Sequence, residues 1–238
     1  MKLAQLPVSL DIQIAHRDGV FVEKGTHTRL GPKIENVVPL GVIQQRVLWI
    51  NLAGSGSKPG CKSNDGKLGY PVQDRYPWDS QGVYARGAET IGCKDCRFLV
   101  REGNNTRSEH DGIPRCGNSL ILMLYRPTDA KVMNLYLTGS AMRTMVDYIK
   151  SYQKQKKPLF VRHLTLKLEA TKFTPKGEQN AVRYATLEVD TGEPTKQSDW
   201  SDTYFDLFKT WRDILSAPPS APNASSSASG GFTPLAMG

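Results

Sequence analysis

Residues 119–170 read SLILMLYRPTDAKVMNLYLTGSAMRTMVDYIKSYQKQKKPLFVRHLTLKLEA, and most of the secondary structure can be predicted outward from them. Residues 119–126 predict a strand that is too apolar for its two faces to be told apart. A turn follows at Pro127, and residues 132–138 form the partner strand of a hairpin. In that partner strand one face carries only apolar side chains, from Met133, Leu135 and Leu137.

An amphipathic helix follows the hairpin. Its apolar residues recur at steps of three and four, which is the helical period; they are Met142, Met145, Val146, Ile149 and Tyr152. Pro158 ends this helix. Two further strands are predicted at 159–170 and 181–189, separated by a polar loop, and a last amphipathic helix covers about 200–214.

Before the hairpin, the alternating residues 46–52 (RVLWINL) predict a first strand, which a long insertion separates from residue 119. The order is then strand, insertion, strand, strand, helix, strand, strand. This order indicates a mainly β protein with an OB-fold-like five-stranded barrel, a helix between strands three and four, and a C-terminal helix. A different small barrel or sandwich is the alternative.

The chain divides into four parts on this interpretation. Residues 1–45 are an N-terminal extension, residues 46–190 are the OB-fold-like domain with an insertion at about 55–117, and residues 191–216 are a C-terminal helical segment. Residues 217–238, APPSAPNASSSASGGFTPLAMG, carry no charge and few large apolar residues, so we expect a flexible tail.

The charge of the chain is strongly basic and uneven. The 238 residues carry a net charge of +8, and residues 1–187 hold 28 Lys and Arg against 16 Asp and Glu. A basic body of this kind favours a polyanionic partner, most often nucleic acid. There is no apolar run of 18 residues, so we expect no membrane span. The first residues do not resemble a signal peptide, and we expect the protein in the cytoplasm.

Four cysteines fall inside the insertion, with the spacing C-x31-C-x2-C-x19-C: Cys61, Cys93, Cys96 and Cys116. The two residues between Cys93 and Cys96 let one tight turn present both sulfurs to a tetrahedral ion, and zinc accepts four thiolates at about 2.3 Å. Four thiolates leave no position for water, so the spacing predicts one structural Zn²⁺. The alternatives are His110 in place of one cysteine, a redox C-x-x-C pair, or four unrelated core thiols.

Around these cysteines the sequence resembles a known family. The segments Cys61-Lys-Ser-Asn-Asp-Gly66, Cys93-Lys-Asp-Cys96 and Arg115-Cys116-Gly are similar to those of zinc-containing single-stranded DNA-binding proteins of bacteriophages and mobile elements. The resemblance covers roughly residues 45–190 and implies an OB-fold with a zinc-bound insertion. It also implies sequence-independent binding of single-stranded DNA in replication or recombination. The tail lacks the acidic tip by which many such proteins recruit replication or recombination partners. Whether the Phe232–Met237 end recruits such a partner is therefore left open by the sequence.

Proteins that bind single strands combine a basic groove with aromatic side chains on which bases stack. The predicted strand phases and the insertion offer a set of such residues for contact with nucleic acid: Trp49, Arg97, Phe98, Tyr125, Arg126, Tyr136, His163, Lys167 and Tyr184. Each aromatic residue taken singly could equally be covered by a loop or helix, so the prediction depends on the set.

The sequence contains no motif of an enzyme class. It lacks G-x-S-x-G, a phosphate loop, a dinucleotide fingerprint and H-E-x-x-H. We therefore expect a binding protein without catalytic residues. A zinc-stabilised adaptor in a larger complex and an RNA-binding module are the alternatives, and the sequence leaves the oligomeric state open.

Overall fold

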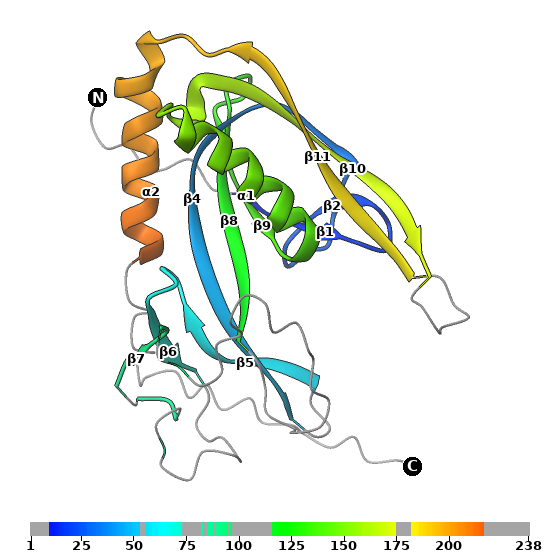
Figure 1. The fold of residues 1–238 in the computed structure, drawn as a ribbon, viewed down its shortest axis with the longest axis vertical. Helices are drawn as coiled ribbons and strands as arrows, with labels where there is room; N and C mark the ends of the chain where they lie inside the picture. The colour runs from blue at the N-terminus through cyan, green and yellow to red at the C-terminus, as the bar shows by residue number, and fades with distance from the viewer. Residues whose placement is uncertain are drawn as a thin grey trace, which may run out of the picture.

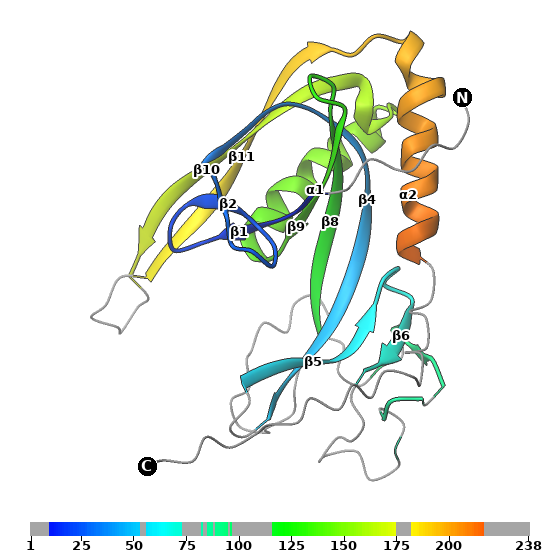
Figure 2. The same ribbon diagram turned by 180° about the vertical axis from the view of Figure 1, so that it is seen from behind.

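In the residues that the structure describes, the fold is mainly β, with a mixed open sheet and two α-helices (Figure 1; Figure 2 gives the reverse view). A computed structural model of the protein describes residues 10–52, 56–72, 82, 85–87, 89–94, 96, 116–174 and 182–216. Among these residues, no helix combines the length and the apolar character that crossing a bilayer requires.

The central strand is β4 (Lys33–Leu52), which pairs antiparallel with β8 (Cys116–Arg126) over most of its length. The hairpin partner of β8 is β9 (Lys131–Leu137), and α1 (Gly139–Lys154) follows it. The other elements are β1 (Leu10–Ala15), β2 (Val20–Glu23), β3 (Arg29–Gly31), β5 (Gly56–Ser63), β6 (Leu68–Pro71), β7 (Ile91–Gly92), η1 (Leu159–Val161), β10 (Arg162–Phe173), β11 (Val182–Pro194), η2 (Trp200–Phe205) and α2 (Asp206–Ser216).

Strand β8 is buried on both faces, which explains its continuous apolar run. Leu120, Leu122 and Leu124 belong to one hydrophobic cluster, and the intervening Ile121 and Met123 belong to another. The two clusters lie on opposite sides of the sheet, because successive strand side chains alternate between its faces. The hairpin predicted at 119–138 is therefore confirmed, and both of its faces are core.

Helix α1 covers the first face. Ala141, Met145 and Ile149 pack into the same cluster as the apolar side chains of β8, β9, β10 and β11. Met133, Leu135 and Leu137 all point into this cluster, as their alternation predicts. The face of the sheet that α1 covers is thus an ordinary dry core.

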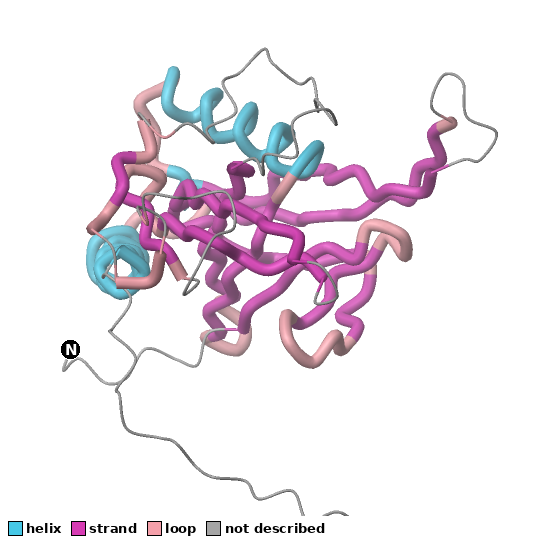
Figure 3. Tube along the Cα trace, turned by 90° about the horizontal axis from the view of Figure 1, so that it is seen from below, coloured by secondary structure: helices cyan, strands magenta, loops and turns pink. Residues whose placement is uncertain are grey.

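Helix α2 covers the second face, together with η2, the π-helical turn that precedes it (Figure 3). The ring of Phe208, on α2, lies very close to Gly41 of β4. A Cβ added to Gly41 would be 1.9 Å from the Phe208 Cε2 atom. Trp211 is 3% exposed, and its Nε1 donates a hydrogen bond of 2.7 Å to Oδ1 of the buried Asn134. The predicted C-terminal helix is therefore an integral layer of the fold.

The described strands do not close into a five-stranded barrel. In the order β11-β10-β4-β8-β9, each strand pairs with the next, and α1 connects β9 to β10. Closing this ring would require β11 to pair with β9. The free edge of β9 instead pairs in parallel with β1, so the sheet continues through β2 and β3 and stays open.

The N-terminal residues differ most from the prediction. Residues 10–31, expected as part of an extension, form three strands of the sheet, and the strand expected at 46–52 begins at Lys33. Asp11 ties this segment to β9, because its carboxylate accepts hydrogen bonds from Asn134 Nδ2 at 2.9 Å and Tyr136 Oη at 3.2 Å. The boundary placed at residue 46 therefore falls inside one continuous strand.

Candidate metal centre and nucleic-acid interface

The four cysteines lie around one small cavity at the end of the sheet away from α1. Cys61 on β5 and Cys116 on β8 are both in register with Leu48 of the β4 strand between them. The cavity has a volume of about 20 Å³, and its lining residues are Arg46, Leu48, Cys61, Ser63, Gly69, Ile91, Cys93, Cys96 and Cys116. The structure thus brings together the four residues that the spacing predicts as zinc ligands.

The turn between β5 and β6 is built by a single carboxylate. Asp65 Oδ1 accepts hydrogen bonds from the backbone N–H groups of Lys67 at 2.7 Å and Leu68 at 3.0 Å, and from Ser63 Oγ at 3.1 Å. Gly66 adopts φ = +73°, a conformation that glycine reaches without steric cost. These contacts explain the Ser-Asn-Asp-Gly sequence after Cys61, and they place β6 and β7 over the cavity.

Gly69 on β6 leaves room for two of the sulfurs. A Cβ added to this residue would lie 2.8 Å from Cys61 Sγ and 3.8 Å from Cys93 Sγ. Both sulfurs therefore approach the same point on the backbone. Cys93 is held there by its own backbone N–H, which donates a hydrogen bond of 2.7 Å to the Lys67 carbonyl.

The electrostatics of the cavity disfavour free thiolates. Burial, together with the neighbouring cysteine sulfurs, raises the pKa of Cys61 and of Cys116 to about 12. For Cys116 the positive charge of Arg46 acts in the opposite direction. Without a cation these thiols are protonated at neutral pH, and a bound metal must displace their protons.

The four cysteine sulfurs around the cavity, and the room that Gly69 leaves for two of them, fit a zinc ion with four thiolate ligands. In the structure the side chains are not yet at ligand spacing: no group of three or more His, Cys, Asp or Glu side chains in the described residues is close enough to hold a metal. Four sulfurs around one cavity are nevertheless the ligand set of a closed, structural zinc site. His110, the alternative ligand, lies outside the described residues.

Three of the residues predicted to contact nucleic acid lie outside the described side chains. Trp49 is on β4, but the structure describes only its backbone, and it describes neither Arg97 nor Phe98. The predictions for these three residues therefore stay predictions.

Tyr125 and Tyr136 lie on the face of the sheet that α2 covers. The Tyr125 ring is 6.0 Å from that of Tyr204, centroid to centroid. The Tyr136 ring carries Lys24 Nζ at 3.6 Å from its centroid. Both tyrosines are half-buried against the second hydrophobic cluster. This face, which the strand phases predict for nucleic acid, is largely occupied by the protein itself.

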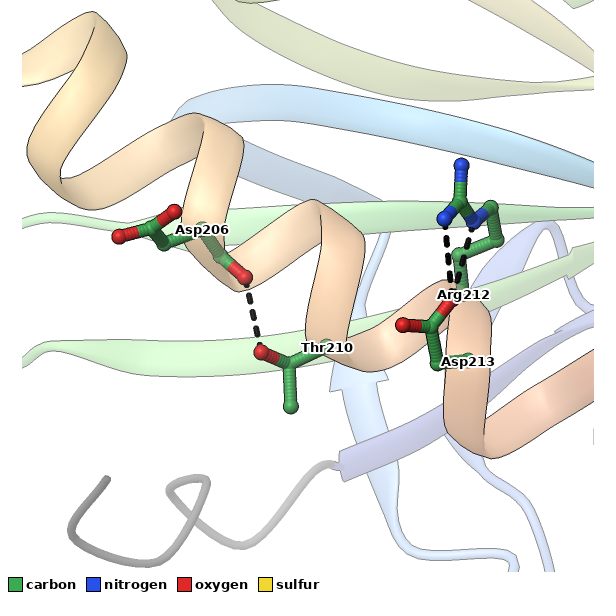
Figure 4. Close-up of polar contacts among 4 residues, drawn as sticks. All are labelled: Asp206, Thr210, Arg212 and Asp213. Atoms are coloured by element: carbon green, nitrogen blue, oxygen red, sulfur yellow. Dashed lines mark hydrogen bonds and ion pairs between the residues drawn. The ribbon is translucent and has the colours of Figure 1, made fainter.

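The two predicted cationic contacts that the structure describes, Arg126 and Lys167, are paired with carboxylates. Arg126 donates two hydrogen bonds to Asp129, at 2.9 and 2.7 Å, and Lys167 Nζ lies 3.4 Å from Glu188 Oε2. On α2, Arg212 is likewise paired with Asp213 at 3.0 Å (Figure 4). These charges are partly neutralised within the protein.

His163 and Tyr184 both belong to the β10–β11 ribbon. His163 is half-buried, and its Nδ1 atom has no hydrogen-bond partner among the described residues. Tyr184 is opposite Thr171 and shares the outward face of the ribbon with Lys167. This outward face alternates with the one that carries Leu166, Leu168 and Leu187 into the core.

The ribbon also carries a cationic pair that the sequence patterns do not predict. Lys172 and Arg183 are directly opposite each other near the tip of the ribbon, which extends away from the body in Figure 1. Both are exposed, and neither has an ion-pair partner within the described part of the chain. By strand alternation the pair lies on the same side of the ribbon as Leu166 and Leu168, past the end of the core, and on the opposite side from Tyr184.

No protein-family model matches the chain, and neither the curated proteins nor the solved structures contain a match.

Proposed function

We propose that the protein binds single-stranded DNA without sequence preference, in replication or recombination, and that its four cysteines hold one structural zinc ion. The observation that carries the DNA proposal is the cross-strand pair Lys172 and Arg183 on the projecting ribbon. Like charges directly opposite each other destabilise a sheet. A phosphate group bound beside both residues would attract them and so offset this repulsion.

The order of strand pairing supports the same proposal. The path β11-β10-β4-β8-β9, with α1 between β9 and β10, is the order that we would expect of an OB-fold, although the described strands form an open sheet. OB-folds bind oligonucleotides with the loops between strands one and two and between strands four and five. Here these loops are the cysteine-bearing insertion and the connection of β10 to β11, whose ends carry Lys172 and Arg183.

Salt-titrated binding to a fluorescent single-stranded oligonucleotide and to its duplex tests the DNA proposal. Affinity for the single strand should fall with salt, with a slope of about −0.7 per neutralised phosphate. Lys172→Gln and Arg183→Gln should each weaken binding and flatten this slope by about 0.7. Lys209→Gln, which removes another exposed charge from α2, is the matched control and should leave the slope unchanged.

Stacking can be tested on the same ribbon. Tyr184→Ala should weaken binding by about 1–3 kcal/mol, whereas Tyr184→Phe keeps the ring and should bind as the unaltered protein does. Equal affinity for single strand and duplex, with no effect at residues 172, 183 and 184, would favour an adaptor protein instead. Tighter binding of RNA than of DNA of the same sequence would make RNA the ligand.

Metal analysis tests the zinc site independently of DNA. The purified protein should contain about one zinc per chain, and Cys93→Ser or Cys96→Ser should lose it, because each removes a thiolate from a four-ligand site. A stably folded, metal-free protein with four titratable thiols would contradict the proposal.

A further inference from the structure

We infer that Arg46 is the counter-charge of the four-cysteine site, and that its guanidinium donates N–H groups to the metal-bound sulfurs. The inference rests on the zinc site proposed above. Arg46 lies on β4, two residues before Leu48, whose register partners are Cys61 and Cys116. Residues two apart on a strand share a face, so Arg46 is on the cysteine side of the sheet.

The position of Arg46 is set by three strands. Its own register partners are Ser63 on β5 and Asn118 on β8, each two residues from a cysteine of the cavity. Arg46 is also the one charged residue among the described lining residues. The exposed Lys62 beside Cys61 points away, because neighbouring residues of β5 alternate between its faces.

The hydrogen bonds of Arg46 are incomplete. Its Nε atom is buried and has no acceptor among the described residues. Nη1 lies 3.5 Å from the Cys93 carbonyl oxygen, which is long for a hydrogen bond. A buried N–H group without an acceptor is costly, so the site in its working form should supply one.

A zinc ion with four thiolates would supply hydrogen-bond acceptors for Arg46. It would also explain why a positively charged side chain lines this cavity. The complex carries two net negative charges, in a cavity whose lining, apart from the cysteines themselves, has Arg46 as its charged residue among the described residues. Groups that donate hydrogen bonds to metal ligands typically change metal affinity by about 10- to 100-fold. A guanidinium stays charged at any physiological pH and has five donors, so it suits this role better than an ammonium group.

One competing explanation comes from Asn118. Its Oδ1 atom is also buried without a partner among the described residues, and it is directly opposite Arg46. The two side chains could pair with each other and take no part in the metal site. In that case Arg46 would stabilise the sheet equally with and without zinc.

Chelator competition on the full-length, zinc-loaded protein separates these explanations. Arg46→Met keeps the aliphatic stem and should weaken zinc binding about 10- to 100-fold. Arg46→Lys keeps the charge and should lose less. Lys62→Met removes the same charge next to Cys61 from the opposite face of β5 and should bind zinc within about twofold of the unaltered protein. In the cobalt-substituted protein, Arg46→Met should also shift the thiolate-to-metal charge-transfer band, because hydrogen bonds to sulfur change its electron donation.

The outcomes that overturn the inference are distinct from failure of the zinc site. Unaltered zinc affinity and cobalt spectrum in Arg46→Met, with one zinc still bound, would overturn the role of Arg46 alone. Equal losses of melting temperature in Arg46→Met and Asn118→Ala, with zinc and without it, would assign the pair to the sheet instead. Absence of zinc from the unaltered protein would overturn the metal site and the role of Arg46 together.

Discussion

Two regions of the molecule are stabilised in different ways. One is the body of the sheet, which holds the two hydrophobic clusters, and the other is the cysteine region, which consists of β5, β6, β7 and the cavity beside them. In the body, β8 is buried on both faces, and Leu122 and Leu124 have no exposed surface. In the cysteine region, β6 carries Leu68 at 43% exposure, and the turn before it depends on hydrogen bonds to Asp65. The body is held by packing, whereas the described part of the cysteine region has few buried apolar side chains and depends on local hydrogen bonds and, on our proposal, on a metal.

Strand β4 belongs to both regions. Val37 and Val38, in its first half, are fully buried in the two clusters of the body, while Arg46 and Leu48, in its second half, line the cysteine cavity. A substitution in each half can therefore show whether the two regions lose stability together or separately.

The largest effect is expected from a cavity in the body. Leu122→Ala should lower the free energy of unfolding by about 2–5 kcal/mol, because the surrounding side chains relax only partly into the space left. Urea unfolding followed by circular dichroism measures it. Leu68→Ala in the cysteine region is the control, and its effect should stay within about 0.5 kcal/mol. Similar losses at both positions would show that the cysteine region is also held by packing.

A smaller effect is expected where α2 meets β4. Gly41→Ala should cost about 1–3 kcal/mol, because the new methyl group overlaps the Phe208 ring and forces α2 to shift. Gly117→Ala, where the nearest atom is 3.8 Å away, is the matched control in thermal unfolding. Combining Gly41→Ala with Phe208→Leu should recover part of the loss. An unaltered melting temperature in Gly41→Ala would mean that α2 is not docked on β4 in solution.

The same substitution in the cysteine region should act on the metal and leave the body unaffected. Gly69→Ala places a methyl group 2.8 Å from Cys61 Sγ, so it should displace that sulfur and weaken zinc binding by tenfold or more, which is about 1.4 kcal/mol. Chelator competition measures this loss. Urea unfolding of the body should change by less than about 0.5 kcal/mol. A large loss of body stability would mean that the two regions unfold as one unit.

The smallest effect is expected from the C-terminal tail, which lies outside the described residues. Deleting residues 217–238 removes an uncharged segment rich in Ser, Ala and Pro, so it should change neither melting temperature nor DNA affinity measurably. Calorimetry and the binding assay above check both quantities. A fall of several degrees would show that the tail packs on the body.

The parts of the fold that the sequence predicts well are those with a continuous apolar run or a strict periodicity. The hairpin of β8 and β9 and helix α1 follow directly from their apolar patterns. Strand β5 was missed because Pro59 and Gly60 interrupt any alternation there, and the first half of β4 was missed because Pro39 and Gly41 resemble a break. Tertiary contacts overrode these local preferences, since Gly41 is required for the approach of Phe208.

The candidate sites show the same division. The spacing of the cysteines was enough to predict that Cys61, Cys93, Cys96 and Cys116 belong together, and the structure places them around one cavity. The aromatic face was not predictable, because the sequence does not show that α2 returns to cover Tyr125 and Tyr136. That depends on a contact between residues far apart in the chain, such as Trp211 with Asn134.

The pairing of β1 with β9 has a consequence for folding during synthesis. Asp11 leaves the ribosome 123 residues before Asn134, its hydrogen-bond partner. At about 5–20 residues per second, β1 waits roughly 6 to 25 s for the strand beside which it will lie. During that interval the Asp11 carboxylate lacks its hydrogen-bond donors Asn134 and Tyr136, and among its neighbours in the fold only the early residues such as Lys24 have been made. A parallel contact of such long range is slow to close even in a complete chain, so the docking of β1 on β9 is expected to be a late step of folding.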